Sequence, residues 1–137
     1  NSDARAKLNS IVHPRVAQKS KQLFDSAPED AIVVYNVPLL VEAGRETEFD
    51  YVVTVEAPED KQIERMISTR GMSKSEAEAR IRAQATPVQR ANVADRILSS
   101  NQNLDLLLKD ADAVYREIQQ LAAKKIQAQS ESSHGRD

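Results

Sequence analysis

Cysteine is absent from this sequence of 137 residues, and histidine occurs only at positions 13 and 134. The absence of cysteine excludes disulfides and thiolate chemistry, and two histidines so far apart do not form a histidine-based metal motif. Aromatic residues make up only 4% of the chain, whose net charge is −2. Such a chain has neither a stacking platform nor a pervasive basic field, so we expect no nucleic-acid partner. A cytoplasmic protein is expected.

Glycine is also scarce, and the three glycines are Gly44, Gly71 and Gly135. A phosphate-cradling loop of the form Gly-x-x-x-x-Gly-Lys-Ser/Thr is therefore missing from these residues. No apolar run approaches the roughly 20 residues that a membrane span needs, and no secretory leader is recognisable. We expect no membrane partner and, from the length, one domain or part of one.

The most informative feature that is present is a basic island, residues 61–96, inside a mildly acidic chain. It carries eight cations and four anions, a net charge of +4, so the remaining residues carry −6. Six of the eight cations are arginine, whose planar fork fits phosphate oxygens better than the ammonium group of lysine does. The cluster indicates a binding site for a small anion with several charges, such as a nucleotide.

Two segments have the composition of buried strands. Ala31–Asn36 and Tyr51–Glu56 are β-branched and apolar on both faces, as in the strands of a parallel sheet. Before them, Ser2–Ala27 has helical periodicity, with Pro14 suited to the first position of a second helix and His13 at the junction. Ligands of such a sheet gather at the carboxyl ends of its strands.

Three helices are predicted within or beside the basic island. Apolar residues spaced for one helix face lie between Pro58 and Arg70, and Gly71 is placed to end that helix. Ser73–Glu76 is a capping box that opens a second helix, and Thr86–Pro87 begins a third. The island is therefore predicted to be a helical hairpin with a bent exit, in the manner of a lid.

The last part of the chain is predicted to close the domain. Asp95–Leu98 has the pattern of a short third strand. A long helix follows, with a buried stripe that comprises Leu107, Ala111, Val114, Ile118 and Leu121. Residues 127–137 are polar and are expected to be a disordered tail. Buried strands joined by helices predict an α/β fold, a parallel sheet flanked by helices.

The order of several motifs resembles the dephospho-CoA kinases, a family of P-loop kinases. These motifs are His13-Pro14, Val37-Pro38-Leu39-Leu40-Val41-Glu42, Gln62, Arg65, Arg70, Gln84, Arg90 and Ala94-Asp95. The resemblance extends from about Leu8 to Leu121. It implies a P-loop kinase-like sheet, here incomplete at the N-terminus, and the last step of coenzyme A synthesis. In that step ATP phosphorylates the ribose 3′-hydroxyl of dephospho-CoA, giving CoA and ADP.

The resemblance also implies roles for particular residues. The dephospho-CoA site would be lined by His13 and the helix after it, with Pro38, Leu39, Leu40 and Glu42. The ATP side would comprise Arg65, Arg70, Gln84, Arg90 and Ser100, with Arg70 and Arg90 acting on the transferred phosphoryl group. Phosphoryl transfer depends on positioning and charge neutralisation, so arginines on a closing element suit it. Mg²⁺ is implied together with ATP, through residues outside this chain.

The resemblance further divides the chain. Residues 1–126 are expected to form a partial kinase domain, with a substrate-binding region at 1–50, a helical lid at 58–94, and a closing strand and helix at 95–126. The phosphate loop of the family would precede Asn1, so the chain alone is expected to be inactive, as a monomer or a weak homo-oligomer. Ser99-Ser100-Asn101 departs from the Asp-Asn that the family has before a Gly-containing turn, which alters the adenine-side contacts.

Plainer interpretations of the same residues stay open. A single exposed arginine is usually a solvated charge, and His13 could simply lie at a helix junction. Glu42 could begin a helix, and Pro38–Leu40 could end a strand. Two other functions are also open, a P-loop kinase for another nucleoside or nucleotide and a non-catalytic α/β binding module. Val37–Glu42 favours the CoA enzyme over the first, and a well-packed monomer would favour the second.

Overall fold

The computed structural model describes residues 2–134. They fall into two compact units, one made of residues 2–35 with 129–134 and the other of Asn36–Ala128. The second unit contains the sheet and all of the basic island. The functional division of the chain at residues 50, 58 and 95 stays a prediction.

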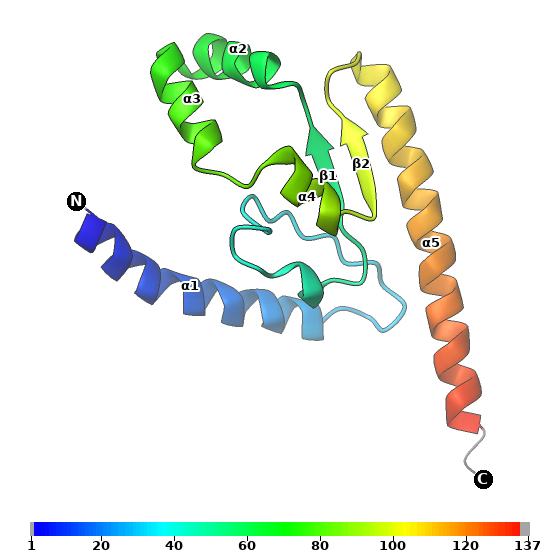
Figure 1. Ribbon diagram of the computed structural model, residues 1–137. Coiled ribbons are helices and arrows are strands. Elements are labelled where there is room, and N and C mark those ends of the chain that lie inside the picture. The colour runs from blue at the N-terminus through cyan, green and yellow to red at the C-terminus, as the bar shows by residue number, and fades with distance from the viewer. Residues whose placement is uncertain (1, 135–137) are drawn as a thin grey trace. The chain divides into compact units, whose positions relative to one another are not determined.

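Helix α1, Ser2–Asp25, is one continuous helix that contains Pro14 in its interior (Figure 1). The prediction of a second helix starting at Pro14 is therefore wrong, and His13 lies within a helix rather than at a junction. An interior proline removes one backbone hydrogen bond and crowds the preceding turn, at a cost of about 3 kcal/mol. Helical periodicity on both sides of Pro14 carries the helix across this single defect.

The segment after α1 folds back on the end of that helix. Tyr35 packs edge-on against Phe24, with ring centroids 5.3 Å apart. The Ser20 hydroxyl donates to the Tyr35 hydroxyl at 2.9 Å, and Ser20 is buried. These contacts define the local structure of the first unit.

The predicted strand Ala31–Asn36 is not a strand in the structure. Its backbone is irregular, and Val33 and Val34 are 50% and 82% exposed. A β-branched segment becomes a strand only where a neighbouring strand supplies hydrogen-bond partners and a packed face, and the described residues provide neither for this segment. Strand propensity alone therefore misled the prediction.

The sheet of the second unit consists of two parallel strands, β1 (Val53–Glu56) and β2 (Arg96–Ser99). This confirms the strands predicted at 51–56 and 95–98 to within two residues. Asp95 fixes the start of the pairing, since its carboxylate accepts from the Val52 N–H at 2.7 Å and its own N–H donates to the Val52 carbonyl at 2.8 Å. The register that results places Glu56 opposite Ser99 at the carboxyl ends.

The predicted lid contains three helices, as expected: α2 (Glu59–Arg70), α3 (Lys74–Arg82) and α4 (Pro87–Val93). Gly71 ends α2 in the left-handed conformation, with φ of 63°, where a side chain would be strained. Complete capping boxes begin α3 and α4. Helices α2 and α3 pack together around Ala77, which is fully buried, and α4 contacts β1 (Figure 1).

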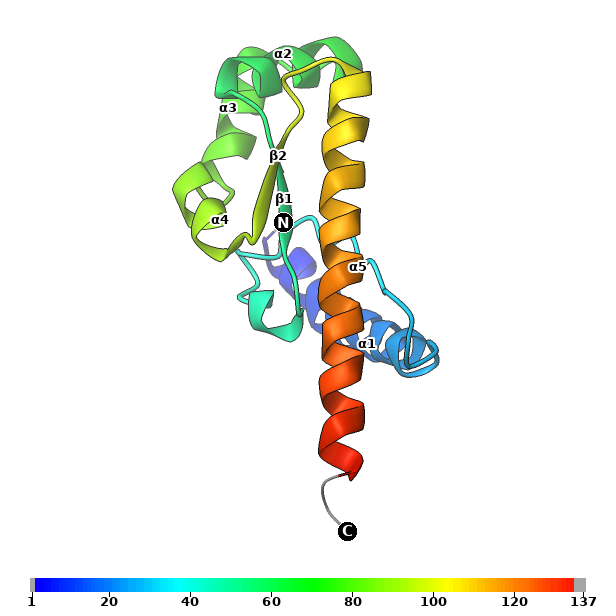
Figure 2. The same ribbon diagram turned by 90° about the vertical axis from the view of Figure 1, so that its right-hand side faces the viewer.

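The last helix, α5 (Leu104–His134), runs alongside β2 in both views (Figures 1 and 2). Arg96 of β2 donates to Glu117 of α5 at 3.0 Å. The predicted stripe is half-buried at four of its five positions, whereas Leu121 is exposed.

The expected disordered tail is wrong for residues 127–134, which continue α5, and residues 135–137 lie outside the described part. Glutamine, alanine and glutamate have good helix propensity, and extending a helix that is already formed costs little, so no buried face is needed.

The buried apolar side chains of residues 2–134 are Val52 and Ala77. Val55 of β1 and Ile97 of β2 are 59% and 51% exposed. The unit therefore owes its geometry mainly to backbone pairing, caps and ion pairs. No helix among the described residues has the length and apolar character needed to cross a bilayer.

Replacement of Asp95 by alanine should destabilise the full-length protein, because the buried Val52 N–H would lose its acceptor. We expect a loss of about 1–3 kcal/mol in the free energy of unfolding, measured by urea denaturation. Asp95→Asn keeps an acceptor oxygen and should retain most of that stability. Equal losses in the two variants would contradict this role of the carboxylate.

Candidate functional site

The candidate site lies at the carboxyl ends of β1 and β2. Glu56, the last residue of β1, is at its centre. Its carbonyl accepts from the Ser100 N–H at 2.8 Å and from the Ser100 hydroxyl at 3.3 Å, while its carboxylate binds Arg90 of α4. One residue at the strand end therefore contacts two of the predicted site residues.

Arg90 and Glu56 form a two-pronged ion pair. The Nε and Nη2 atoms of Arg90 each donate to a different carboxylate oxygen of Glu56, both at 2.6 Å. The two side chains are only 22% and 20% exposed. The hydrogen bond to Glu56 raises the pKa of Arg90, partly opposed by its burial, so the guanidinium remains charged.

The junction between α3 and α4 is held through Ala85, because both backbone groups of this residue form hydrogen bonds to side chains. Its N–H donates to the Glu42 carboxylate at 2.7 Å, and its carbonyl accepts from Nη1 of Arg90. Glu42, Glu56, Ala85 and Arg90 are here called the Arg90 cluster. The cluster connects the turn at residue 42, the end of β1 and the last turn of the lid.

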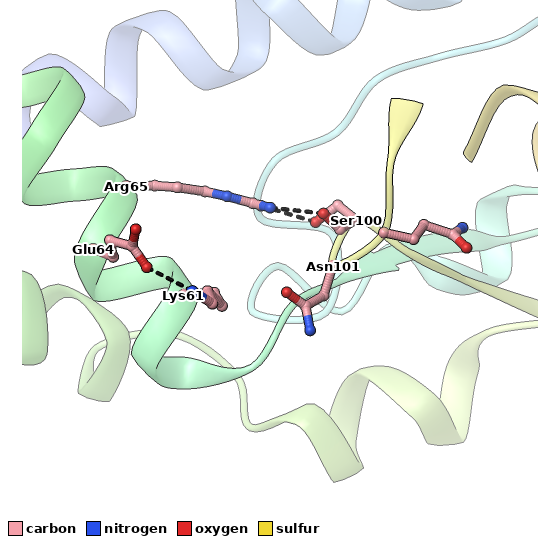
Figure 3. Close-up of a pocket in the computed structure, with 6 residues that line it drawn as sticks. Lys61, Glu64, Arg65, Ser100 and Asn101 are labelled. Carbon is pink, nitrogen blue, oxygen red and sulfur yellow. Dashed lines mark hydrogen bonds and ion pairs between the residues drawn. The ribbon is translucent and has the colours of Figure 1, made fainter. Parts of the chain in front are cut away.

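A second group of predicted residues meets in a shallow hollow between α2 and the loop after β2 (Figure 3). Arg65 reaches across it and donates to the Ser100 hydroxyl at 3.0 Å and to the Ser100 carbonyl at 2.6 Å. The hollow measures about 340 Å³. Its other lining residues are Lys61, Glu64, Asn101 and Gln102.

A third group lies between α2 and α3, in a hollow of about 260 Å³. Arg70 and Gln84, both predicted, line it together with Arg80 and Gln62. Met66 and Ile81 complete the lining, so no acidic side chain faces this hollow. Arg65 and Arg70 open onto different hollows because five positions along a helix turn the side chain by about 140°.

The basic island retains three arginines without a salt bridge, as judged within residues 2–134. Five of its eight cations are within 4.0 Å of a carboxylate, namely Lys61, Lys74, Arg82, Arg90 and Arg96. Arg65, Arg70 and Arg80 are the remainder. The positive charge of the lid is thus concentrated at the two hollows rather than spread over its surface.

The residues predicted for the dephospho-CoA side are divided between the two compact units. Pro38, Leu39, Leu40 and Glu42 lie in one run of turns, in which the Ala43 N–H donates to the Leu39 carbonyl at 3.1 Å. Leu39 is half exposed and Glu42 is already engaged by Ala85. His13 lies on α1, in the other compact unit, and its side chain is exposed.

The sequence analysis missed Glu56, Arg80 and Lys61. A signal for Glu56 was present, because a carboxylate at the carboxyl end of a predicted strand lies where such sheets collect functional groups. Arg80 and Lys61 were counted among the eight cations of the basic island without a role of their own. That Arg80 lines the same hollow as Arg70 depends on how α3 packs against α2, which the spacing of residues within one helix does not specify.

Comparison with known proteins decides the family. A sequence model described as dephospho-CoA kinase matches residues 1–106. The chain belongs to the dephospho-CoA kinase family. It is 42% identical over 114 residues to a dephospho-CoA kinase from Thermobifida fusca, an alignment that covers 83% of this chain and 57% of the relative. A dephospho-CoA kinase from Corynebacterium jeikeium is 35% identical over 115 residues, with 82% and 59% covered.

A solved structure supports the same assignment. The crystal structure of a protein from Thermus thermophilus superposes with a TM-score of 0.70 at 28% sequence identity, covering 85% of this chain and 61% of that one. The predicted α/β, P-loop kinase-like fold is thereby confirmed. The chain spans about three fifths of the length of these two dephospho-CoA kinases.

The capping box of α3 provides a test of the lid geometry by titration. The Ser73 N–H and hydroxyl both donate to the Glu76 carboxylate at 2.8 Å, and these hydrogen bonds lower the pKa of Glu76. A lowered folded-state pKa stabilises the protein above the ordinary carboxyl pKa, and this contribution disappears as the pH falls through the folded value. In Ser73→Ala we expect the pKa of Glu76 to rise, as followed by NMR titration of its side chain.

An unchanged pKa of Glu76 in Ser73→Ala would show that the hydroxyl plays no part. The matched control is Glu48, whose pKa is lowered by its hydrogen bond to Arg45 and not by Ser73. The pKa of Glu48 should be the same in the two proteins.

Proposed function

We propose that the full-length protein catalyses ATP-dependent phosphorylation of the ribose 3′-hydroxyl of dephospho-CoA. The γ-phosphoryl group passes from ATP to the 3′-oxygen, which gives CoA and ADP and releases the hydroxyl proton. Residues 58–94 supply the lid over the reacting phosphates. The protein would act in the cytoplasm.

The observation that carries this proposal is the placement of Arg65, Arg70 and Arg80. These are the cations of the basic island that have no carboxylate within 4.0 Å among the described residues, and they line the two hollows of the lid. Guanidinium groups that are not held in a salt bridge suit the charge that spreads over phosphoryl oxygens during transfer. The amide side chain of Gln84 beside Arg70 adds hydrogen-bond donors for the same oxygens, whereas the Gln62 amide already donates to the Ala57 carbonyl at 2.8 Å.

The dephospho-CoA side is proposed to include the turns at Pro38–Glu42. A contact between His13, on α1, and this substrate stays a prediction. Exposed apolar groups such as Leu39 suit the uncharged parts of a large substrate. Glu42 reaches the lid through Ala85, so it connects this segment to the lid rather than projecting freely. Ser100, held by Arg65, is proposed to lie on the ATP side.

Mg²⁺ accompanies ATP in phosphoryl transfer and neutralises charge on its phosphates. Within residues 2–134, no group of three or more acidic or histidine side chains converges to hold a metal ion. These residues therefore do not fit a dedicated metal site, and no step is assigned to the ion here. A nucleotide-bound Mg²⁺ would be held by other residues and by the phosphates themselves.

A kinase for another nucleoside or nucleotide is the second candidate, because its lid would need the same arginines. The decisive assay supplies ATP with dephospho-CoA, adenosine or AMP as acceptor to the full-length protein and follows the products by mass spectrometry. Conversion of dephospho-CoA alone to a product one phosphate heavier supports the proposal. Preferential phosphorylation of adenosine or AMP would favour the second candidate over the proposed function. Failure to phosphorylate any of the three acceptors would favour a non-catalytic binding module.

Removal of Arg70 should weaken catalysis in the full-length protein. Loss of a charge-assisted contact costs about 1.5–3 kcal/mol, so turnover in Arg70→Ala should fall roughly ten- to a hundredfold. Arg82→Ala is the matched control, because Arg82 lies on the same lid, 69% exposed, and has only Glu78 as its salt-bridge partner. Steady-state kinetics that are unchanged in Arg70→Ala, or equally reduced in both variants, would refute the assignment of Arg70.

A further inference from the structure

The carboxylate of Glu56 is wholly committed to one partner. Each of its oxygens accepts a hydrogen bond from Arg90, at 2.6 Å. Glu56 belongs to the strand and Arg90 to the lid, so the pair crosses from the sheet to its covering helices. The resemblance to the family gave Arg90 a role at the phosphates and gave none to Glu56.

Arg90 still has free hydrogen-bond donors after these contacts. A guanidinium group has five N–H donors, one on Nε and two on each Nη nitrogen. Glu56 takes one from Nε and one from Nη2, and the Ala85 carbonyl takes one from Nη1. Two N–H groups remain, one on each Nη nitrogen. The guanidinium is therefore fixed on two sides and keeps donors for one more anion.

Fixing a guanidinium in this way has a catalytic consequence. A free arginine side chain samples many rotamers, and ordering it at each turnover costs conformational free energy. A preorganised donor avoids this cost, and its orientation relative to the reacting atoms is what makes it effective. Glu42 adds to the order, because its bond to the Ala85 N–H fixes the residue whose carbonyl binds Arg90.

Glu56 also positions the other side of the site through its backbone. Its carbonyl holds Ser100 at 2.8 Å, and Ser100 in turn receives both hydrogen bonds of Arg65. Arg65 and Arg90 lie on different lid helices. Glu56, at the end of β1, therefore positions both of them, Arg90 directly and Arg65 through Ser100. A side-chain substitution at position 56 affects Arg90 and leaves the backbone contact to Ser100 in place.

We infer that Glu56 is a positioning residue, whose carboxylate orients Arg90 so that its two remaining N–H groups meet the phosphates of the nucleotide. This inference rests on the proposed function. It predicts that the contribution of Glu56 to catalysis passes entirely through Arg90. A purely structural salt bridge would instead affect folding without favouring one substrate.

The test is a double-mutant cycle in the full-length protein. Glu56→Gln should lower kcat/KM for ATP about ten- to a hundredfold and leave the KM for dephospho-CoA within about twofold. Arg90→Lys removes the fork that Glu56 holds, so adding Glu56→Gln to Arg90→Lys should change kcat/KM by less than about twofold. Glu56→Asp keeps the charge and should recover part of the loss.

The matched control is Glu117→Gln, which weakens a different carboxylate–arginine pair, one that joins α5 to Arg96 of β2. Its kinetics should equal those of the unsubstituted protein. The inference is overturned if Glu56→Gln is as harmful in the Arg90→Lys background as in the original one. It is also overturned if the parameters for ATP and dephospho-CoA fall together in step with a lower Tm.

A measurement that needs no turnover separates this inference from the proposed function. The Arg90 Nε–H signal in NMR spectra should be protected from exchange with water in the full-length protein and lose that protection in Glu56→Gln. Affinity for a non-hydrolysable ATP analogue, measured by calorimetry, should fall in the same variant. If both changes occur and dephospho-CoA is not phosphorylated, the proposed substrate fails and the positioning role stands. An unchanged Arg90 signal overturns the role whatever the activity.

Discussion

The parallel pairing of β1 with β2 is the constraint on which the rest of the second unit depends. It is fixed at one end by the reciprocal hydrogen bonds of Asp95 and Val52 and at the other by the two hydrogen bonds that Ser100 donates to the Glu56 carbonyl. Between them only four residue pairs face each other. A slip by one residue would turn every side chain of a strand to the opposite face. It would also separate the Glu56 carboxylate from Arg90 and the Ser100 carbonyl from Arg65.

The lid is organised differently from the sheet, by strong local signals. Capping boxes at Ser73 and Thr86 and a left-handed glycine at position 71 fix where each helix begins or ends. These devices need no distant partner, because they satisfy backbone groups at the helix ends with side chains only a few residues away. The lid can therefore have a defined shape even though Ala77 is its one buried apolar residue among those described.

Charge in the lid is divided between structural and available groups. Lys74 and Arg82 share Glu78, and Arg90 is held by Glu56. The exposed pairs of Lys74 and Arg82 with Glu78 contribute little to stability. The half-buried pair of Arg90 with Glu56 instead fixes the orientation of the Arg90 guanidinium. The net charge of the basic island predicted that an anion would bind. The salt bridges divide these cations further: Arg65, Arg70 and Arg80 have no carboxylate within 4.0 Å among the described residues, whereas Arg90 is paired with Glu56 and keeps two N–H groups.

Two predictions failed for different reasons. Ala31–Asn36 has the composition of a strand but no neighbouring strand among the described residues, a partner that the segment itself does not specify. Pro14 has the preferences of a helix start but lies inside α1, where the helical periodicity on both sides of it outweighs that single preference. The helix at 127–134 shows the converse, since α5 continues through a polar segment for which the sequence predicts disorder.

The sequence by itself determined what depends on neighbours along the chain. The caps, the end of α2 at Gly71, both paired strands, the order of motifs that marks the family and the excess of arginine could all be recognised there. The meeting of Glu56 with Arg90, 34 positions apart, and of Arg65 with Ser100, 35 positions apart, was decided only by the tertiary structure. Such contacts depend on strand register and helix packing, which arise from many weak interactions acting together and leave no periodic signal in the sequence.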